Sequence, residues 1–121
     1  MQAINLADKL STFDEVYVPK VVAELNGQLV KIAKFHGTFP WHSHADEDEM
    51  FLVLEGRFDL EFRDRTVTVS KGEFCVVPRG VEHRPVAAEV ASVMLFEPAT
   101  VRNTGDVVNE RTIEAEGLER L

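Results

Sequence analysis

The sequence predicts an all-β protein, an antiparallel sandwich or barrel. Residues 57–63 (RFDLEFR) place Phe58 and Leu60 on one face and Asp59 and Glu61 on the other, the two-residue alternation of a half-buried strand. Turn signals separate several such short runs between about residues 21 and 97. No segment with helical periodicity of roughly ten residues interrupts these runs. Short strands in direct succession are typical of antiparallel sandwiches and barrels.

The first elements are an N-terminal arm over residues 1–20 and a strand over residues 28–35. In the arm, Asn5 can cap a short helix that carries Leu6 and Leu10. The strand QLVKIAKF alternates imperfectly, because Lys31 shares a face with apolar neighbours. We expect both ends of the chain to pack over the outside of the barrel.

The central elements begin with a hairpin, in which Asp64 and Arg65 turn the strand 57–63 into residues 66–70. Further strands are expected at EFCVV, at EHRPV after a Pro-Arg-Gly turn, and at VASVMLF. The tail, residues 98–121, is polar and rich in turn signals, with a possible helical turn near residues 114–119. The side chains expected to line and fill the barrel are Phe51, Val53, Phe58, Leu60, Phe62, Met94 and Phe96.

Composition limits the possible partners and compartments. The chain has 121 residues and a formal net charge of -8, so we expect a single domain over residues 1–121 with its barrel core at about 21–97. Nucleic acids and anionic membrane surfaces bind positively charged proteins, so this acidic chain is not expected to bind either of them. The apolar runs are too short to span a bilayer, no secretion signal is evident at the N-terminus, and Cys75 is the only cysteine. These features predict a cytoplasmic protein without disulfides.

The segment FPWHSHADEDEMFLVLEG carries the first candidate site residues. His42 and His44 are two positions apart, so on a strand both imidazoles face the same side. Glu49 follows after an acidic turn and shares a strand face with Phe51. Downstream, the Pro-Arg-Gly turn delivers His83 onto a further strand.

Three imidazoles and one carboxylate, from His42, His44, Glu49 and His83, form a ligand set suited to a divalent first-row transition metal ion. We expect one such ion, with iron, manganese, nickel and zinc as the candidates. Glu47 is the nearest alternative to Glu49 if the turn has a different register. The remaining histidine, His36, is expected at the surface or beside the site.

Two motifs give this sequence a family resemblance. Residues 37–56 resemble the first cupin motif, in which glycine, His-x-His, glutamate and glycine follow in order. Residues 72–87 resemble the second, with glycine, Pro-x-Gly and histidine. The first gap is one residue shorter than usual, and Ala87 stands where asparagine is frequent. Neither departure affects a position that binds metal in the family.

The resemblance implies a double-stranded β-helix, the jelly-roll barrel of cupins, similar to the small mannose-6-phosphate isomerase-like members. It also implies one metal ion held by the four residues named above, a small-molecule ligand and a homodimer. Cupins host many activities, so an isomerase or epimerase, a dioxygenase, a non-catalytic binding or sensor protein and a purely structural barrel all stay open.

Other side chains near the motifs carry weaker predictions. Trp41 should point away from the metal by strand alternation, with a role in packing or at a dimer face. Arg57, Arg63 and Arg79 could bind a substrate carboxylate or phosphate. Arg84 faces away from His83 by the same alternation, so no substrate role is expected for it.

Overall fold

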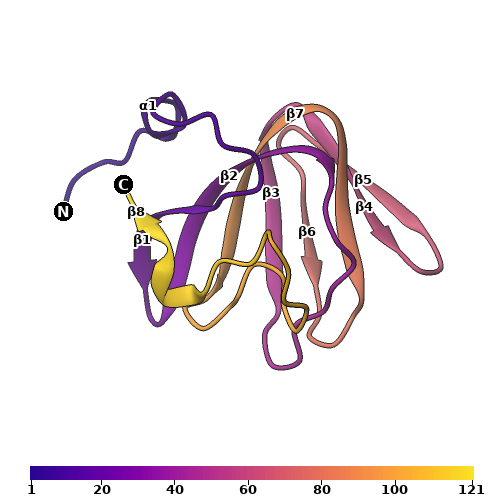
Figure 1. The fold of residues 1–121 in the computed structure, drawn as a ribbon. Helices are drawn as coiled ribbons and strands as arrows, with labels where there is room; N and C mark the ends of the chain where they lie inside the picture. Colours follow the sequence, from indigo (N-terminus) through magenta and orange to yellow (C-terminus); the bar gives the residue numbers. More distant parts are fainter.

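The computed structural model describes residues 1–121 and contains one eight-stranded sheet with a single short α-helix. The prediction of an all-β protein is therefore confirmed. Figure 1 shows the strands curving around a common interior, with the hairpin of β4 (Arg57–Phe62) and β5 (Thr66–Ser70) extending to one side. The elements are α1 (Leu6–Leu10), β1 (Lys20–Leu25), β2 (Gln28–Thr38), β3 (Glu49–Glu55), β4 (Arg57–Phe62), β5 (Thr66–Ser70), β6 (Phe74–Val77), β7 (His83–Pro98), the 3-10 turn η1 (Ala115–Gly117) and β8 (Glu119–Arg120).

Strand β7 organises the sheet. The order is β5-β4-β7-β2-β1-β8, and β3 pairs with both β6 and β7. The first half of β7 lies beside β4, its second half lies beside β3, and β2 runs along its other edge. Where the sequence predicted two strands, at EHRPV and VASVMLF, the chain forms this one continuous strand of 16 residues. Its length lets β7 contribute to both halves of the barrel.

The predicted hairpin between residues 57 and 70 is confirmed as β4 and β5, which pair antiparallel from Arg57 opposite Ser70 to Glu61 opposite Thr66. Its turn is closed by the Phe62 N–H, which donates to the Arg65 carbonyl at 2.8 Å. The buried face of β4 is the one that the sequence alternation predicts. Phe58 and Leu60 point inward, whereas Asp59 and Glu61 do not.

The main core fills the barrel interior with apolar side chains from alternate positions of the strands. Phe51 and Val53 of β3 and Phe58 and Leu60 of β4 lie in it as predicted, and Phe62 packs at its edge. Several aromatic rings meet edge to face, including Phe35 and Phe58, whose centroids are 5.1 Å apart. These contacts form a tightly packed wall on one side of the interior.

The prediction that Met94 and Phe96 line the interior is wrong. In β7 the inward residues are Val93, Leu95 and Glu97, whereas Met94 and Phe96 are half-buried on the outer face. Both faces of this strand are apolar over residues 93–96, so hydrophobicity did not identify the inner one.

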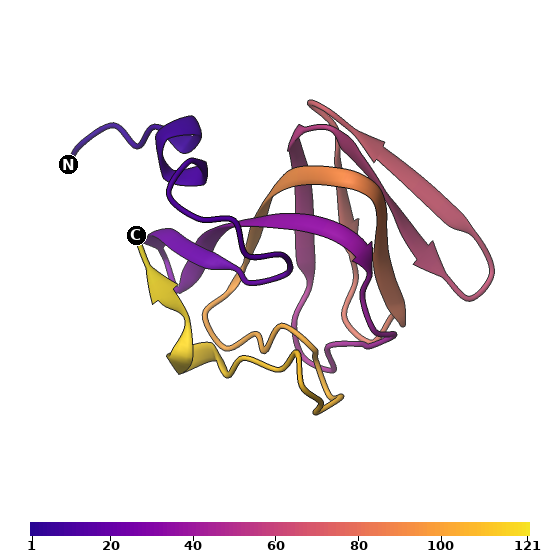
Figure 2. The same cartoon turned by 45° about the horizontal axis from the view of Figure 1, so that its top comes forward.

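Both ends of the chain lie against the barrel. The predicted N-terminal helix is confirmed as α1, and the Asn5 side chain caps it by accepting a hydrogen bond from the Asp8 N–H at 3.0 Å. Its residues Leu6 and Leu10 pack around Phe13 and Ile32 on the outside of β2. The polar tail passes across the barrel opening before β8 pairs with β1, as Figure 2 shows. No helix in this structure is long and apolar enough to cross a bilayer.

Candidate metal centre

His42 and His83 are held together by their own backbones. The His42 N–H donates to the His83 carbonyl at 3.0 Å and the His83 N–H donates to the His42 carbonyl at 2.9 Å, which forms an isolated antiparallel bridge. The segment around His42 is therefore extended, and the alternation of an extended chain turns His42 and His44 to the same side. Both imidazoles are buried, each with 4% of its surface exposed.

The four predicted residues converge on one point inside the barrel. Glu49 is the first residue of β3 and His83 is the first residue of β7, while His42 and His44 lie in the loop before β3. One ligand atom from each of His42, His44, Glu49 and His83 lies within 4.8 Å of the others, and all four side chains are buried. Glu49 Oε1 is 3.3 Å from the Nε2 atoms of both His44 and His83.

Hydrogen bonds fix the orientation of two of the rings. Nδ1 of His42 lies 2.9 Å from the Pro40 carbonyl oxygen, and Nδ1 of His83 lies 2.8 Å from that of Val81. A carbonyl oxygen can only accept, so each Nδ1 carries the proton and each Nε2 presents a lone pair to the cluster. Such outer partners typically set the tautomer of metal-binding histidines.

Three buried atoms of the cluster have no hydrogen-bond partner, namely His44 Nε2, Glu49 Oε1 and His83 Nε2. Unpartnered buried polar atoms are costly in an apolar interior, and three that face one another form a set of donors for a cation. The arrangement could hold a metal ion, and nitrogen donors with one carboxylate suit a first-row transition metal.

The ionisable groups of the cluster differ in the direction in which their pKa values are shifted. Burial lowers the pKa of His42 to about 4, helped by the neighbouring His83. For His44, burial alone would lower the pKa, but the Glu49 carboxylate raises it above its usual range. Burial would raise the pKa of Glu49, yet the close approach of the Glu97 carboxyl and of the His44 and His83 rings holds it well below its usual range. Glu49 is thereby kept in the ionised form, the form in which a carboxylate binds a divalent ion.

The two loops that carry the cluster are tied to each other. The Gly80 N–H donates to the His44 carbonyl at 2.7 Å, and the Arg79 N–H donates to Asp48 Oδ1 at 2.8 Å. The predicted Pro-Arg-Gly turn thus holds the acidic loop in register with the strand that begins at His83. Arg79 also pairs with Asp48 through its side chain, so its guanidinium is occupied at the surface.

The alternatives considered from the sequence lie elsewhere. Glu47 accepts a hydrogen bond from the Thr100 hydroxyl at 2.6 Å and is not among the four clustered residues. His36 is exposed at the end of β2 and is likewise outside the cluster.

Comparison with known proteins decides the family. The sequence pattern of the family described as "Cupin domain" matches residues 28–97, which is more than half of the chain. The chain is a cupin. The matched region runs from β2 through β7 and contains all four clustered residues, and the family and the cluster together fit a metal-binding cupin.

Solved structures support the assignment of this cupin. A cupin-2 domain-containing protein from Shewanella frigidimarina is 46% identical, with a TM-score of 0.78, over 78% of this chain and 93% of that chain. Protein NMB1881 from Neisseria meningitidis is 31% identical, with a TM-score of 0.74, over 80% of this chain and 99% of its own. The "Uncharacterized protein YdbB" of Bacillus subtilis is 39% identical over 64 residues, and that match spans 52% of this cupin and only 57% of YdbB.

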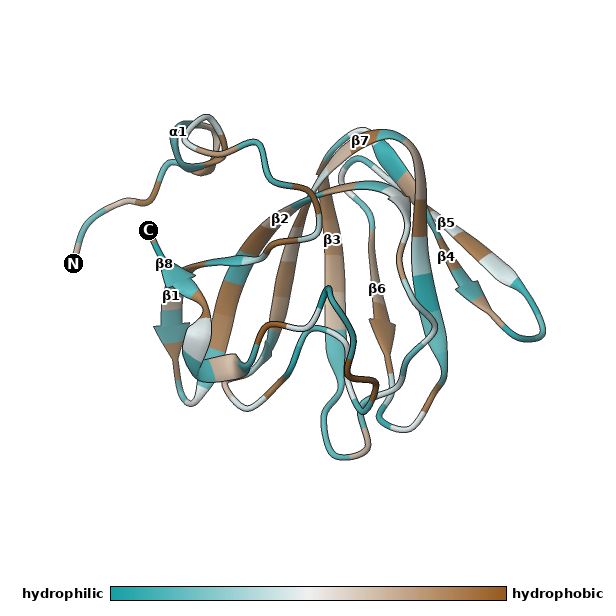
Figure 3. Ribbon diagram, viewed as in Figure 1, coloured by the Kyte–Doolittle hydropathy of each residue, from teal (hydrophilic) through white to brown (hydrophobic).

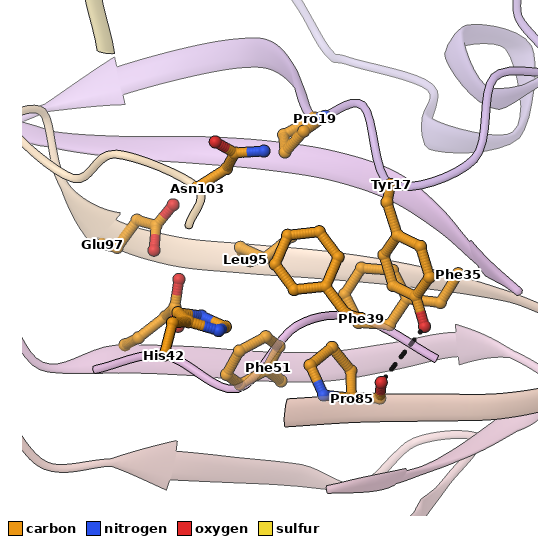
Figure 4. Close-up of a pocket in the computed structure, with 11 residues that line it drawn as sticks. Tyr17, Pro19, Phe35, Phe39, His42, Phe51, Pro85, Leu95, Glu97 and Asn103 are labelled. Atoms are coloured by element: carbon orange, nitrogen blue, oxygen red, sulfur yellow. Dashed lines mark hydrogen bonds between the residues drawn. The ribbon is translucent and has the colours of Figure 1, made fainter. Parts of the chain in front are cut away.

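A cavity adjoins the cluster, and Figure 4 shows that its two ends differ. At one end lie His42, Glu97 and Asn103, and Glu49 also contributes to the lining. At the other end the wall is apolar and mostly aromatic, formed by Tyr17, Phe35, Phe39, Phe51, Pro85 and Leu95. The arrangement suits a small ligand with one polar and one apolar side.

Both terminal segments contribute to this cavity, which the sequence did not predict. Tyr17 and Pro19 come from the N-terminal arm and Asn103 from the tail. Tyr17 has a φ of 58°, unusual for a residue other than glycine, and its hydroxyl donates to the Gly37 carbonyl at 2.7 Å. The hydrogen bond holds the ring over the cavity despite the strained backbone.

A buried ion pair next to the cluster was also missed. Lys31 Nζ lies 2.6 Å from Glu97 Oε1, and 2% or less of either residue is exposed. Glu97 adjoins Glu49, and burial together with that neighbouring charge raises the pKa of Glu97 well above its usual range. One signal was present in the sequence, since Lys31 interrupts an otherwise apolar face with Leu29 and Ala33.

The arginines near the motifs are engaged outside the barrel. The guanidinium carbons of Arg63 and Arg84 lie 3.9 and 4.7 Å from the ring centroid of Trp41, so this ring stacks against both and points away from the cluster as expected. Arg63 pairs with Glu82 and Arg84 pairs with Glu61. No arginine or lysine lines the cavity.

Proposed function

We propose that this cupin binds one divalent first-row transition metal ion through His42, His44, Glu49 and His83 and acts on a small molecule in the adjoining cavity. The observation that carries the proposal is the set of three buried, unpartnered ligand atoms that face one another. Iron, manganese, nickel and zinc all accept imidazole and carboxylate donors, so any of the four suits the site.

The proposed reaction is an isomerisation or epimerisation, or a dioxygenation. A bound ion would polarise a substrate oxygen as a Lewis acid or, in the case of iron, support oxygen chemistry. The chain itself positions the histidine rings through the carbonyls of Pro40 and Val81. Its aromatic wall excludes water from one side of the substrate, which strengthens polar interactions inside the cavity.

Elemental analysis of protein purified without chelators tests the metal proposal. We expect near-stoichiometric metal in the natural protein and little in His44→Ala. The matched control is His36→Ala, which removes an exposed histidine outside the cluster and should leave the metal content unchanged. Equal metal in all three proteins, or none in the natural protein after reconstitution, would contradict the ligand set.

Oxygen consumption then separates the reaction classes. A dioxygenase should contain iron and consume oxygen with a substrate, whereas an isomerase should turn over equally well under nitrogen.

A non-catalytic binding or sensor protein is the second candidate. The cavity favours it in one respect, because Tyr17, Pro19 and Asn103 of the terminal segments help to line it and could enclose a ligand. A protein of this kind would be stabilised thermally by a ligand that is recovered unchanged.

We further propose a homodimer formed through the outer face of β6, β3 and β7. Two apolar rows cross these strands in register, one of Val76, Met50 and Phe96 and the other of Phe74, Leu52 and Met94. The apolar colour of β3 and β6 is visible in Figure 3. Phe74 and Val76 are 63% and 51% exposed.

The charge of the chain supports a second copy as the partner for these rows. Each chain carries a formal charge of -8, so two copies repel wherever acidic surfaces meet. The two rows contain no charged residue, and a face of this kind can contact its own copy without that cost. The free edge of β6, which pairs only with β3, adds a second reason for covering this side.

A further inference from the structure

The tryptophan that precedes the first proposed metal ligand contacts two arginines on the outside of the barrel. Trp41 lies between His42 and Pro40, and the carbonyl oxygen of Pro40 orients the His42 ring through the 2.9 Å contact with Nδ1. A displacement of the backbone at Trp41 therefore moves both the imidazole and the oxygen that orients it. The contacts of the half-buried indole ring thus bear on the position of His42.

The two contacts come from different parts of the sheet. The guanidinium carbon of Arg63 lies 3.9 Å from the centroid of the Trp41 ring, and that of Arg84 lies 4.7 Å from it. Arg84 is the second residue of β7, and Arg63 directly follows β4. A planar guanidinium attracts the face of an aromatic ring and stacks on it. The ring therefore joins the loop before β3 to two neighbouring strands.

Both guanidinium groups are themselves anchored. Arg63 donates through Nε and Nη2 to the two carboxylate oxygens of Glu82, at 2.7 and 3.2 Å. Arg84 donates through Nε to Glu61 Oε1 at 2.7 Å. Exposed ion pairs of this kind add little to stability, but a two-point contact limits the rotation of the guanidinium. The effect of these pairs is thus to hold flat groups against the Trp41 ring.

This stack lies directly behind the proposed metal ligands. His42 and His83 exchange both of their backbone hydrogen bonds, at 3.0 and 2.9 Å. In an antiparallel pair the adjacent residues, Trp41 and Arg84, lie opposite each other and face the other side. The same two backbone segments therefore carry the imidazoles inside and the stack outside. A contact that stops these segments from sliding also fixes the distance between the two Nε2 atoms.

The segment that carries His42 has little else to fix its register. Residues 39–48 belong to no strand, and the bridge between His42 and His83 is an isolated one. One further backbone hydrogen bond joins the segment to β7, from the Phe39 N–H to the Pro85 carbonyl at 3.0 Å. Ligand side chains must be held to within about 0.5 Å for a productive metal site, and contacts of neighbouring side chains supply that precision.

We infer that Trp41 is a positioning residue for the metal centre. Held by Arg63 and Arg84 on the outside, it keeps His42 beside His83 at the spacing that a single ion requires. Trp41 touches neither the ion nor a ligand in the cavity and acts through His42. The inference rests on the proposed function, because it assigns Trp41 a part in holding the proposed metal ion.

Metal affinity, measured by competitive titration with Zn²⁺, tests this role. Trp41→Ala should raise the dissociation constant about tenfold or more, the effect typical of outer residues that orient metal ligands. Trp41→Phe keeps a flat ring for the guanidinium groups and should recover most of the affinity. The double variant Arg63→Met/Arg84→Met removes both guanidinium groups, leaves the indole in place and should also bind Zn²⁺ more weakly than the natural protein.

A spectroscopic measurement separates positioning from support of the fold. The visible absorption of bound Co²⁺ depends on its coordination geometry, so the spectrum of cobalt-loaded Trp41→Ala should differ from that of the natural protein. Phe13→Leu is the matched control, because the Phe13 ring also contacts two cations, Lys20 and Lys34, but packs outside β2 and away from the cluster. This control should lower the melting temperature and leave the Zn²⁺ affinity and the cobalt spectrum unchanged.

The results distinguish the failure of this inference from that of the proposed function. A Trp41→Ala protein that melts earlier but keeps the natural Zn²⁺ affinity and cobalt spectrum would overturn the inference and leave the metal site standing. If Trp41→Ala does not fold, the arginine double variant decides, and natural affinity in that variant overturns the inference. A natural protein that binds neither ion would overturn the proposed function, and with it the inference.

Discussion

Gly105 in the C-terminal tail lies directly against the backbone of Ser43, between the two histidines of the first motif. A Cβ atom added to Gly105 would collide with the Ser43 carbonyl oxygen and would also contact the His42 ring. Its φ of 58° is in the left-handed region, which favours glycine. The tail can pack against the loop that carries His42 and His44 because this residue has no side chain.

Gly105→Ala should therefore lower both stability and metal affinity. We expect a loss of about 1–3 kcal/mol in the free energy of unfolding, from strain and overpacking, together with a weaker metal complex because the His42 loop must shift. Thermal unfolding and a competitive metal titration measure the two effects. Gly117→Ala is the matched control, since nothing lies within 4 Å of a Cβ atom there. Equal effects of the two substitutions would contradict the close contact.

Removal of the metal should destabilise the protein. Binding to the folded state alone adds about 2.7 kcal/mol when the free metal concentration is one hundred times its dissociation constant. A chelator should lower the melting temperature, and returning the metal should restore it. His83→Ala should show the same low melting temperature with and without metal. A chelator effect of equal size in that variant would place the ion elsewhere.

The metal-free protein should lose stability as the pH falls from 6.5 towards 4. Burial lowers the pKa of His42 from 6.5 to about 4, so in this range the unfolded chain takes up a proton that the folded chain excludes. The loss amounts to about 3 kcal/mol at most. His44 has a raised pKa, so the stability that it contributes is present below pH 6.5 and is lost as the pH rises above that value.

Chemical denaturation across this pH range, with the His42→Gln variant alongside, measures the contribution of His42. Glu97 has a raised pKa and acts with the opposite sign in the same range, because its stabilising effect is lost as the pH rises. The difference between the natural protein and the variant isolates the histidine. Identical pH profiles of the two proteins would contradict the burial of His42.

The Lys31–Glu97 pair should behave as a coupled unit. Lys31→Met alone leaves Glu97 buried without its partner and should cost about 3–5 kcal/mol of unfolding free energy. The double variant Lys31→Met/Glu97→Met should recover most of that loss. Denaturant unfolding of both single variants and the double variant gives the coupling energy. Additive effects would show that the 2.6 Å contact contributes nothing.

Phe74→Glu should disrupt the proposed dimer. The substitution places a carboxylate on the uncharged outer face, where a second acidic copy would meet it. We expect light scattering to give roughly half the mass of the natural protein at equal concentration. Val108→Glu is the control, since Val108 is exposed in the tail and belongs to neither apolar row. A monomeric natural protein would overturn the proposed interface.

Much of this fold follows from local patterns. The alternation of Phe58 and Leu60 with charged residues correctly identified β4, and the turn at Asp64 and Arg65 identified its hairpin. The four clustered residues were also chosen from spacing and motif order, and the structure brings them within 4.8 Å of one another. Whether they bind metal stays a prediction that the experiments above test.

Strand β7 shows where local patterns fail. Val93, Met94, Leu95 and Phe96 are all apolar, so their hydrophobicity does not distinguish the inner face of the strand from the outer one. Pairing with β2 and β3 decided the matter, because it turned Leu95 and Glu97 inward and left Met94 and Phe96 outside.

The sequence by itself determined the all-β class, the hairpin and the spacing of the four candidate ligands, because strand alternation and turn chemistry act between near neighbours in the chain. Only the tertiary structure decided that Lys31 meets Glu97, that Tyr17 and Asn103 reach the cavity and that Gly105 packs on Ser43. These residues are far apart in sequence, and their contacts depend on how the whole sheet closes and how the two ends cross it.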